Sequence, residues 1–257
     1  MTEATTQTCT TMTTAKARTG WNAGAFAFFE AMGSQGALRI LTDGRLAKWT
    51  MKGDAKGAAS LLHMLEALDY IDYCNELRAK YHGLPALKVS DVAMAAAAHN
   101  CNWAGPNGNH PDKLGHGWPV EVEEGGVAEN LAWGTSSPEE VFQGWYWDER
   151  RNHATRNGGQ TGHYLKIISP AFWVTGFAVS NNAVAKGGVL QVGGNYGTVH
   201  EPYFMSHAPD RLYTVAEYRA RLENYIGALA AVLDASDADS GTAGRALGGG
   251  SDNVDES

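Results

Sequence analysis

The sequence contains no long apolar run, few cysteines and fewer basic than acidic residues. No stretch approaches the ~18 consecutive apolar residues that a bilayer-spanning helix needs. The first residues are rich in threonine, not basic and then apolar, so no signal peptide is visible in this chain. The 20 Lys and Arg residues against 28 Asp and Glu residues give a formal charge of -8. This charge argues against nucleic acid or an anionic membrane surface as the main partner.

The three cysteines do not have the spacing of a zinc finger or of a disulfide framework. Cys9 lies in the threonine-rich start, whereas Cys74 and Cys101 fall in helical patterns and are either buried thiols or one disulfide. What the chain does have is a globular composition, with 44% apolar and 19% charged residues over a length of 257. Such a chain can bury a sizeable core.

Composition divides the chain into an ordered body and two polar ends. Residues 1–19 carry nine threonines and little that is apolar, which predicts a disordered tail. Residues 235–257 are rich in Gly, Ala, Ser and Asp, the composition of a flexible linker. The ordered body is therefore expected over residues 20–234.

Apolar periodicity and capping signals predict five helices in the body. They cover residues 25–32, 60–81, 90–103, 137–153 and 214–233. The fourth has the clearest start: Ser137 is the cap, Pro138 takes the first helical position, and Glu140 closes a capping box.

Two runs of β-branched and aromatic residues, 173–180 and 189–196, predict adjacent strands joined by a hairpin-like loop. Residues 104–127 show neither helical nor strand periodicity, and a loop of this length is typical of function or flexibility. His200-Glu201 is followed by Pro202, so the second histidine of a zinc protease helix is missing. Neither a dinucleotide-binding loop nor a nucleophile elbow is present.

Three sequence motifs are specific enough to be compared with those of known families. They are Ala-Glu-Asn-Leu-Ala-Trp-Gly at 128–134, Gly-Trp-Tyr-Trp-Asp-Glu at 144–149 and Thr-Gly-His-Tyr at 161–164. In this order and at these distances they closely resemble the CAP superfamily, which includes cysteine-rich secretory proteins, antigen 5, pathogenesis-related protein 1 and bacterial SCP-like domains.

The resemblance implies an α+β fold, a three-layer α-β-α sandwich. The CAP domain is expected over residues 61–205. A helical N-terminal extension is expected over 20–60, and a C-terminal helix over 206–234 that packs on the domain.

The resemblance also implies an open cleft in which two histidines and two acidic residues hold a divalent metal ion. Glu129 matches the glutamate of the family's Glu-Asn-Leu motif, and His163 matches the histidine of its Gly-His-Tyr motif. The predicted metal ligands are drawn from His116, Glu129, Asp148, Glu149 and His163.

Two of the metal ligands are not fixed by the sequence: the first histidine and the second carboxylate. His116 is nearer to Glu129 than His110 is, and lies in a Leu-Gly-His-Gly context, so it is preferred as the first histidine. Asp148 and Glu149 follow Trp145 by three and four residues, so both fall on its face of an α-helix and either could reach the cleft.

Imidazole and carboxylate ligands suit Zn²⁺ or a similar divalent ion better than a metal that prefers thiolates. Residues expected to contact a ligand in the cleft are His110, Trp133, Trp145 and Tyr164. The tryptophans also serve as core and as cleft wall in the simplest interpretation.

The sequence therefore predicts an extracellular or cell-surface CAP domain, more a binding module than an enzyme. Its cleft would bind a divalent metal and a lipid or other small apolar ligand, and a cell-surface protein is a further possible partner. One alternative is a metal-assisted hydrolase with Glu129 or Glu149 as the base. Another is an interaction module with a vestigial cleft.

Overall fold

The computed structural model describes residues 24–42, 57–107, 127–133, 137–185, 188–198 and 211–245. The helices are α2 (Ala25–Met32), α3 (Gln35–Leu41), α4 (Leu61–His82), α5 (Asp91–Asn107), α7 (Pro138–Phe142), the π-helix η2 (Gln143–Asp148), α8 (Glu149–Thr155), α9 (Gly162–Ile167) and α11 (Val215–Arg245). The strands are β1 (Lys88–Ser90), β2 (Val127–Trp133), β3 (Val174–Ala185), β4 (Gly188–Thr198) and β5 (Leu212–Tyr213). The predicted tail at 1–19, together with His110 and His116, lies outside the described residues.

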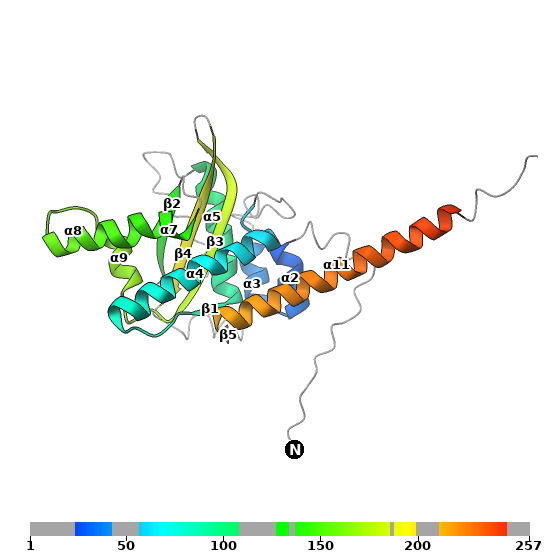
Figure 1. Cartoon of the computed structure of the whole chain (residues 1–257), viewed down its shortest axis with the longest axis horizontal. Coiled ribbons are helices and arrows are strands. Elements are labelled where there is room, and N and C mark those ends of the chain that lie inside the picture. The colour runs from blue at the N-terminus through cyan, green and yellow to red at the C-terminus, as the bar shows by residue number, and fades with distance from the viewer. Residues whose placement is uncertain are drawn as a thin grey trace, which may run out of the picture.

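The strands form one mixed sheet in the order β2-β4-β3-β1-β5 (Figure 1). The predicted hairpin is confirmed, since β3 and β4 are consecutive and antiparallel. β1 runs parallel to β3, and the other neighbouring pairs are antiparallel. β2 is the strand at one edge of this sheet.

Helices cover both faces of the sheet. A Cβ at Gly176 of β3 would lie 2.2 Å from the backbone of Ala93, so α5 lies directly on that face. The next residue, Phe177, points to the opposite face and stacks on Tyr70 of α4, with ring centroids 4.7 Å apart. Figure 1 shows α4 in front of the sheet and α5 behind it. The predicted α+β sandwich of three layers is confirmed.

Local capping signals set the helix ends as the sequence indicated. Ser60 accepts a hydrogen bond from the backbone N–H of His63 at 3.2 Å and so begins α4. Gly83 ends α4 in the left-handed conformation, with φ of 62°. Ser137 accepts from the backbone N–H of Glu140 at 3.3 Å, as the predicted cap requires.

The helices from both ends of the described chain meet at Asp91, the first residue of α5. Arg221 of α11 donates to both of its oxygens, at 2.7 and 2.8 Å, and Tyr218 donates at 2.9 Å. Ser34, just before α3, also donates to Asp91. Burial alone would lower the pKa of Arg221, but the hydrogen bonds and charge of Asp91, with Tyr218 and Tyr213, raise it. Asp91 thus ties α3 and α11 to the domain.

Several elements differ from the sequence prediction. α11 continues to Arg245, so residues 235–245 are helical where a flexible tail was predicted. This stretch extends a helix that begins at Val215, and adding residues to an existing helix costs less than starting a new one. The prediction also missed α3, α9 and the strands β1, β2 and β5. Apart from β2 these are short, and short segments give little periodicity to detect.

Cys74 and Cys101 are free, buried thiols and do not form the disulfide that the sequence left open. Burial raises the pKa of each thiol to about 12. Cys101 donates to the backbone oxygen of Ala178 at 3.7 Å and to the hydroxyl of Ser180 at 3.5 Å. Both cysteines therefore serve as packing residues of the domain core.

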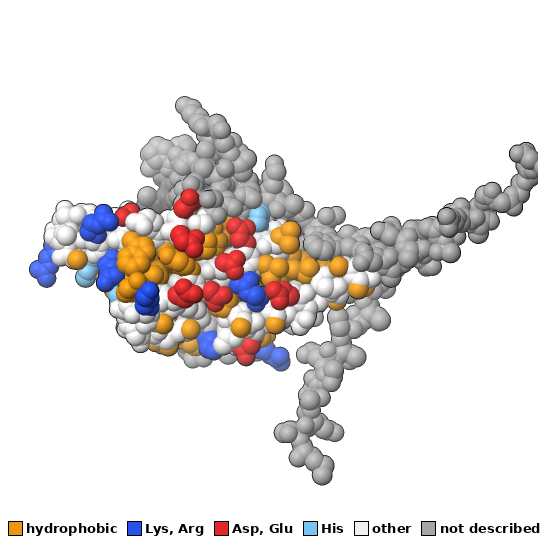
Figure 2. Space-filling model, in the orientation of Figure 1, with side chains coloured by type: hydrophobic (Ala, Val, Ile, Leu, Met, Phe, Trp, Pro, Cys, Tyr) orange, Lys and Arg blue, Asp and Glu red, His pale blue; other side chains and the backbone are white. Residues whose placement is uncertain are grey.

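The outer face of α4 is acidic. Figure 2 shows Asp and Glu side chains along this face, and an apolar patch bordered by Lys and Arg. Asp69 and Asp72 of α4 form ion pairs with Arg219 of α11, at 2.8 and 3.3 Å.

Among the described helices, none is long and apolar enough to cross a bilayer.

Candidate functional site

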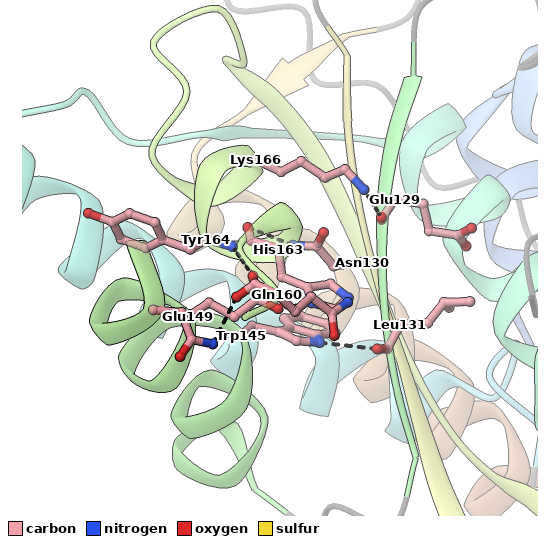
Figure 3. A network of polar contacts seen from close by, with 10 residues as sticks. Glu129, Asn130, Leu131, Trp145, Glu149, Gln160, His163, Tyr164 and Lys166 are labelled. Atoms are coloured by element: carbon pink, nitrogen blue, oxygen red, sulfur yellow. Dashed lines mark hydrogen bonds and ion pairs between the residues drawn. The ribbon is translucent and has the colours of Figure 1, made fainter. Parts of the chain in front are cut away.

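The centre of the site is a carboxylate–imidazole pair. Glu149, at the start of α8, and His163, in α9, are joined by a contact of 2.6 Å between Oε1 and Nδ1 (Figure 3). The other oxygen of Glu149 accepts the backbone N–H of Tyr164 at 3.0 Å. The Glu149 side chain is 6% exposed, against 22% for His163. The carboxylate is thus buried behind an imidazole that reaches solvent.

This pattern assigns the ring nitrogens of His163. An ionised carboxylate only accepts hydrogen bonds, so Nδ1 of His163 carries the hydrogen and donates it to Glu149. In a neutral imidazole Nε2 then keeps its lone pair. Among the described residues, no hydrogen bond engages Nε2. A histidine held in this way presents one nitrogen as a ligand or as a proton acceptor.

Trp145 fixes the plane of the imidazole. Its ring stacks on His163 with centroids 5.7 Å apart and an angle of 19° between the planes. Its Nε1–H donates to the backbone oxygen of Leu131 at 3.1 Å, which anchors the ring to β2. Trp145 is also a buried core residue. Its predicted role as a cleft wall that contacts a ligand stays a prediction.

The π-helix η2 favours Glu149 over Asp148 as the carboxylate that contacts His163. A π-helix closes its hydrogen bonds from i to i+5 and so takes more residues per turn than an α-helix. Within η2, the position that aligns with Trp145 therefore moves from between the third and fourth following residues to just past the fourth, which favours Glu149. Asp148 is exposed, accepts from Gln143 at 3.0 Å and lies 3.6 Å from Arg151. Asp148 is thus a solvated helix residue away from the pair.

The Glu-Asn-Leu motif contributes through its backbone and its asparagine. Lys166 of α9 donates to the backbone oxygen of Glu129 at 2.7 Å, and Trp145 donates to that of Leu131. Between them, Asn130 donates from Nδ2 to the backbone oxygen of His163 at 3.4 Å. The bonds from Lys166 and Trp145 satisfy carbonyls of an edge strand that would otherwise lack partners in the sheet. They also hold η2 and α9 against β2.

The Glu129 carboxylate, however, lies on the other face of the sheet. In the sheet register Glu129 lies opposite Tyr196 of β4, which lies opposite Gly176 of β3, so the Glu129 side chain lies on the face covered by α5. There the carboxylate is buried and accepts a hydrogen bond from Asn100 of α5. Figure 3 shows it directed away from His163. The structure therefore does not bring Glu129 to the pair, contrary to the arrangement expected from the sequence.

The other predicted residues divide as follows. His110 and His116 lie outside the described residues, and Trp133 lies in β2 without a described side chain. Tyr164 is buried, and its ring lies 5.4 Å from that of Tyr146. Its backbone N–H, not its side chain, contacts the pair. Within the part of the chain that the structure describes, no group of three or more His, Cys, Asp or Glu side chains could hold a metal ion.

Lys166 is a site residue that the sequence analysis missed. It follows His163 by three residues and so lies on the same face of α9, which is the signal that could have found it. Burial lowers the pKa of Lys166, while the charges of Glu129 and Glu149 raise it. A half-buried cation therefore accompanies the acid–imidazole pair.

The fold and the site together define an α-β-α sandwich domain with an acid–imidazole pair held against an edge strand. The model of the cysteine-rich secretory protein family, CAP, matches residues 71–193, which include Trp145, Glu149 and His163. The chain carries a domain of the CAP family, and the resemblance seen in the three motifs is confirmed.

Comparison with solved structures finds a similarity to the structure of BmVAL-1. The identity is 17%, the match covers 53% of this chain and 77% of that chain, and the TM-score is 0.38. No curated protein matches the chain.

Proposed function

We propose that this CAP domain is an extracellular binding module in which Nε2 of His163 is a ligand for a divalent metal ion. The observation that carries the proposal is the 2.6 Å contact between Glu149 and Nδ1 of His163. Histidines that bind metals commonly donate their other ring N–H to a carboxylate, which fixes the tautomer and the direction of the free lone pair. Trp145 fixes the ring plane in addition.

The donor chemistry favours zinc. Imidazole nitrogen is a good zinc ligand, and the described part of the site holds no thiolate, since Cys74 and Cys101 are buried in the core. The described residues supply one ligand and the group that orients it. We place the second imidazole in the segment 108–126, with His116 as the first choice and His110 as the second, and water or ligand atoms complete the coordination.

In this proposal Glu149 orients the histidine and is not itself a ligand. Both of its oxygens are engaged, one by His163 and the other by the N–H of Tyr164. The same engagement argues against Glu149 as the general base of a hydrolase, because a base needs an oxygen that can reach the proton it removes. Binding is therefore the better supported function.

The remaining parts of the proposal concern location and ligand. The family that matches residues 71–193 is described as one of secretory proteins, which supports a place outside the cell. A lipid or other small apolar ligand, and a cell-surface protein partner, stay predictions.

Zinc titration by calorimetry tests the metal site. We expect wild-type protein to bind one zinc ion per chain and His163→Ala to weaken binding by more than about 100-fold, because orienting groups alone contribute 10–100-fold. His116→Ala and His110→Ala then identify the second imidazole, since only the ligand's variant should show a comparable loss.

His153→Ala is the matched control. His153 lies in α8 and is exposed, and its ring contacts that of Tyr164 at a centroid distance of 5.5 Å without touching the pair. Its replacement should leave zinc affinity unchanged. Equal affinity of wild type and His163→Ala would refute the site as described.

A further inference from the structure

Aromatic rings and two cations form a surface patch where the C-terminal end of α4 meets η2 and α8. The guanidinium of Arg150 lies 5.2 Å from the ring centroid of Tyr81 and 5.6 Å from that of Trp147. Nζ of Lys80 also lies 5.3 Å from the centroid of Tyr81. Lys80 and Tyr81 are exposed, whereas Trp147 and Arg150 are half-buried. These four residues are called the aromatic–cation patch, and Figure 2 shows apolar side chains bordered by Lys and Arg at this end of the molecule.

Ring contacts hold the patch in shape. Tyr146, below it, is fully buried, and its hydroxyl shares a hydrogen bond of 2.8 Å with Nε2 of His82. Trp147 packs edge to face on Tyr146, with centroids 4.9 Å apart and planes at 88°. It packs in the same way on Tyr81, at 5.2 Å and 83°. Because the rings under Arg150 fix one another, little conformational entropy is lost when a partner binds to them.

Neither cation of the patch has an anionic partner within the described part of the chain. No hydrogen bond or ion pair there involves Lys80 or Arg150. The nearby carboxylate of Asp148 lies 3.6 Å from Arg151 instead. Attraction to the ring faces leaves the N–H groups at the edge of the Arg150 guanidinium free to donate. A carboxylate accepts such N–H groups in pairs.

We propose that the aromatic–cation patch is a docking site for a partner protein that presents a carboxylate to Arg150. Tyr, Trp and Arg are the residue types enriched at the positions that dominate the energy of protein interfaces. A partner carboxylate supplies the acceptors that the guanidinium lacks, and the rings exclude water around the pair. The inference requires no metal ion at His163, so it and the proposed function can fail independently.

The acidic face of α4 favours a protein partner over a membrane or a polyanion. Glu76 and Asp72 are exposed and lie about one and two turns before Lys80 on the same helix. Figure 2 shows acidic side chains on the face that also carries the apolar patch. A uniformly negative surface would meet these carboxylates together with the patch and be repelled. A protein can place one carboxylate on Arg150 and a different group beside Glu76.

A peptide titration followed by NMR tests the inference on the full chain. The probe is a short peptide with two glutamates and a leucine between Gly and Ser residues. We expect it to shift the Nε–H signal of Arg150 and the indole N–H signal of Trp147, whereas the same peptide with glutamines should shift neither. Arg150→Gln should weaken binding roughly tenfold, because a hydrogen bond to a charged group is stronger than one between neutral groups.

Arg151→Gln is the matched control. It removes the same charge from the next residue, whose side chain is 71% exposed and pairs with Asp148. Its affinity for the peptide should stay within about twofold of wild type. Lys80→Gln changes an exposed residue and should weaken binding about two- to threefold without disturbing the fold. Circular dichroism of each variant checks that the fold is kept.

Four results would overturn the inference. They are the absence of any shift with the glutamate peptide, equal affinity of Arg150→Gln and wild type, an equal loss in Arg151→Gln, and binding of heparin or anionic vesicles in place of the peptide. Sedimentation velocity of the chain alone addresses a second copy as the occupant. A dimer that Arg150→Gln dissociates would show that the patch binds another copy of this chain, and the proposed partner would be wrong.

Discussion

Replacing Asp91 with alanine is expected to lower the free energy of unfolding by about 3–5 kcal/mol. The side chain is 4% exposed, and it accepts hydrogen bonds from Arg221, Tyr218 and Ser34. Its removal leaves the guanidinium of Arg221 in a largely buried place with no carboxylate to pair with. Urea unfolding followed by circular dichroism measures the change.

Asp69→Ala is the matched control for this prediction. Asp69 also pairs with an arginine of α11, Arg219, at 2.8 Å, but its side chain is 59% exposed. An exposed pair contributes at most about 1 kcal/mol because water competes for both charges. Similar losses in Asp91→Ala and Asp69→Ala would show that Asp91 does not hold the extension helices to the domain.

Replacing Arg78 with methionine is expected to cost about 3 kcal/mol or more of unfolding free energy. Arg78 of α4 is fully buried and donates to four backbone oxygens. They belong to Ile167 at 2.5 Å, Ser169 at 3.1 Å, Phe172 at 3.1 Å and Pro85 at 3.4 Å. Methionine has a similar length and no donor, so these carbonyls lose their partner. Burial lowers the pKa of Arg78.

Arg78 donates to the backbone oxygen of Ile167, the last residue of α9. Loss of Arg78 should therefore also destabilise the C-terminal end of the helix that carries His163. Amide hydrogen exchange over residues 165–172 should therefore speed up more than the global change in stability requires. Lys80→Met, two residues along the same helix and exposed, should change stability by less than about 0.5 kcal/mol. Comparable effects of both substitutions would contradict the role given to Arg78.

The helices were predictable where the sequence carries local signals. Ser60, Gly83 and Ser137 set helix ends through bonds to their own neighbours, so no knowledge of the rest of the chain is needed. β1 pairs with β3 and with β5 over two residues each, so the two short strands exist only beside these neighbours. Such pairing is a property of the whole fold, which a local pattern cannot contain.

The sequence predicted that the three motifs lie close together in the fold. It did not predict which side chains and which backbone atoms make the contacts. His163, Trp145 and β2 do converge. A strand turns successive side chains to opposite faces, so one residue decides whether Glu129 or Asn130 faces His163. The register in the sheet gives that position to Asn130. The sequence of a motif does not by itself show to which face of the sheet each side chain points.

The choice of Glu149 over Asp148 has a similar origin. On an ordinary α-helix both residues lie on the face of Trp145, and only the π-helix η2 separates them. A π-helix has no sequence signal comparable to a capping box. Here the helix type, which depends on packing, determines which carboxylate faces the imidazole.

The most direct test of the central claim is the protonation state of the two ring nitrogens of His163. Two-bond ¹⁵N–¹H correlation spectra of ¹⁵N-labelled protein at neutral pH report which nitrogen carries hydrogen. We predict a proton on Nδ1, held by Glu149, and a lone pair on Nε2 that shifts when zinc is added. A proton on Nε2 in the metal-free protein, or an Nε2 signal unchanged by zinc, would contradict the account.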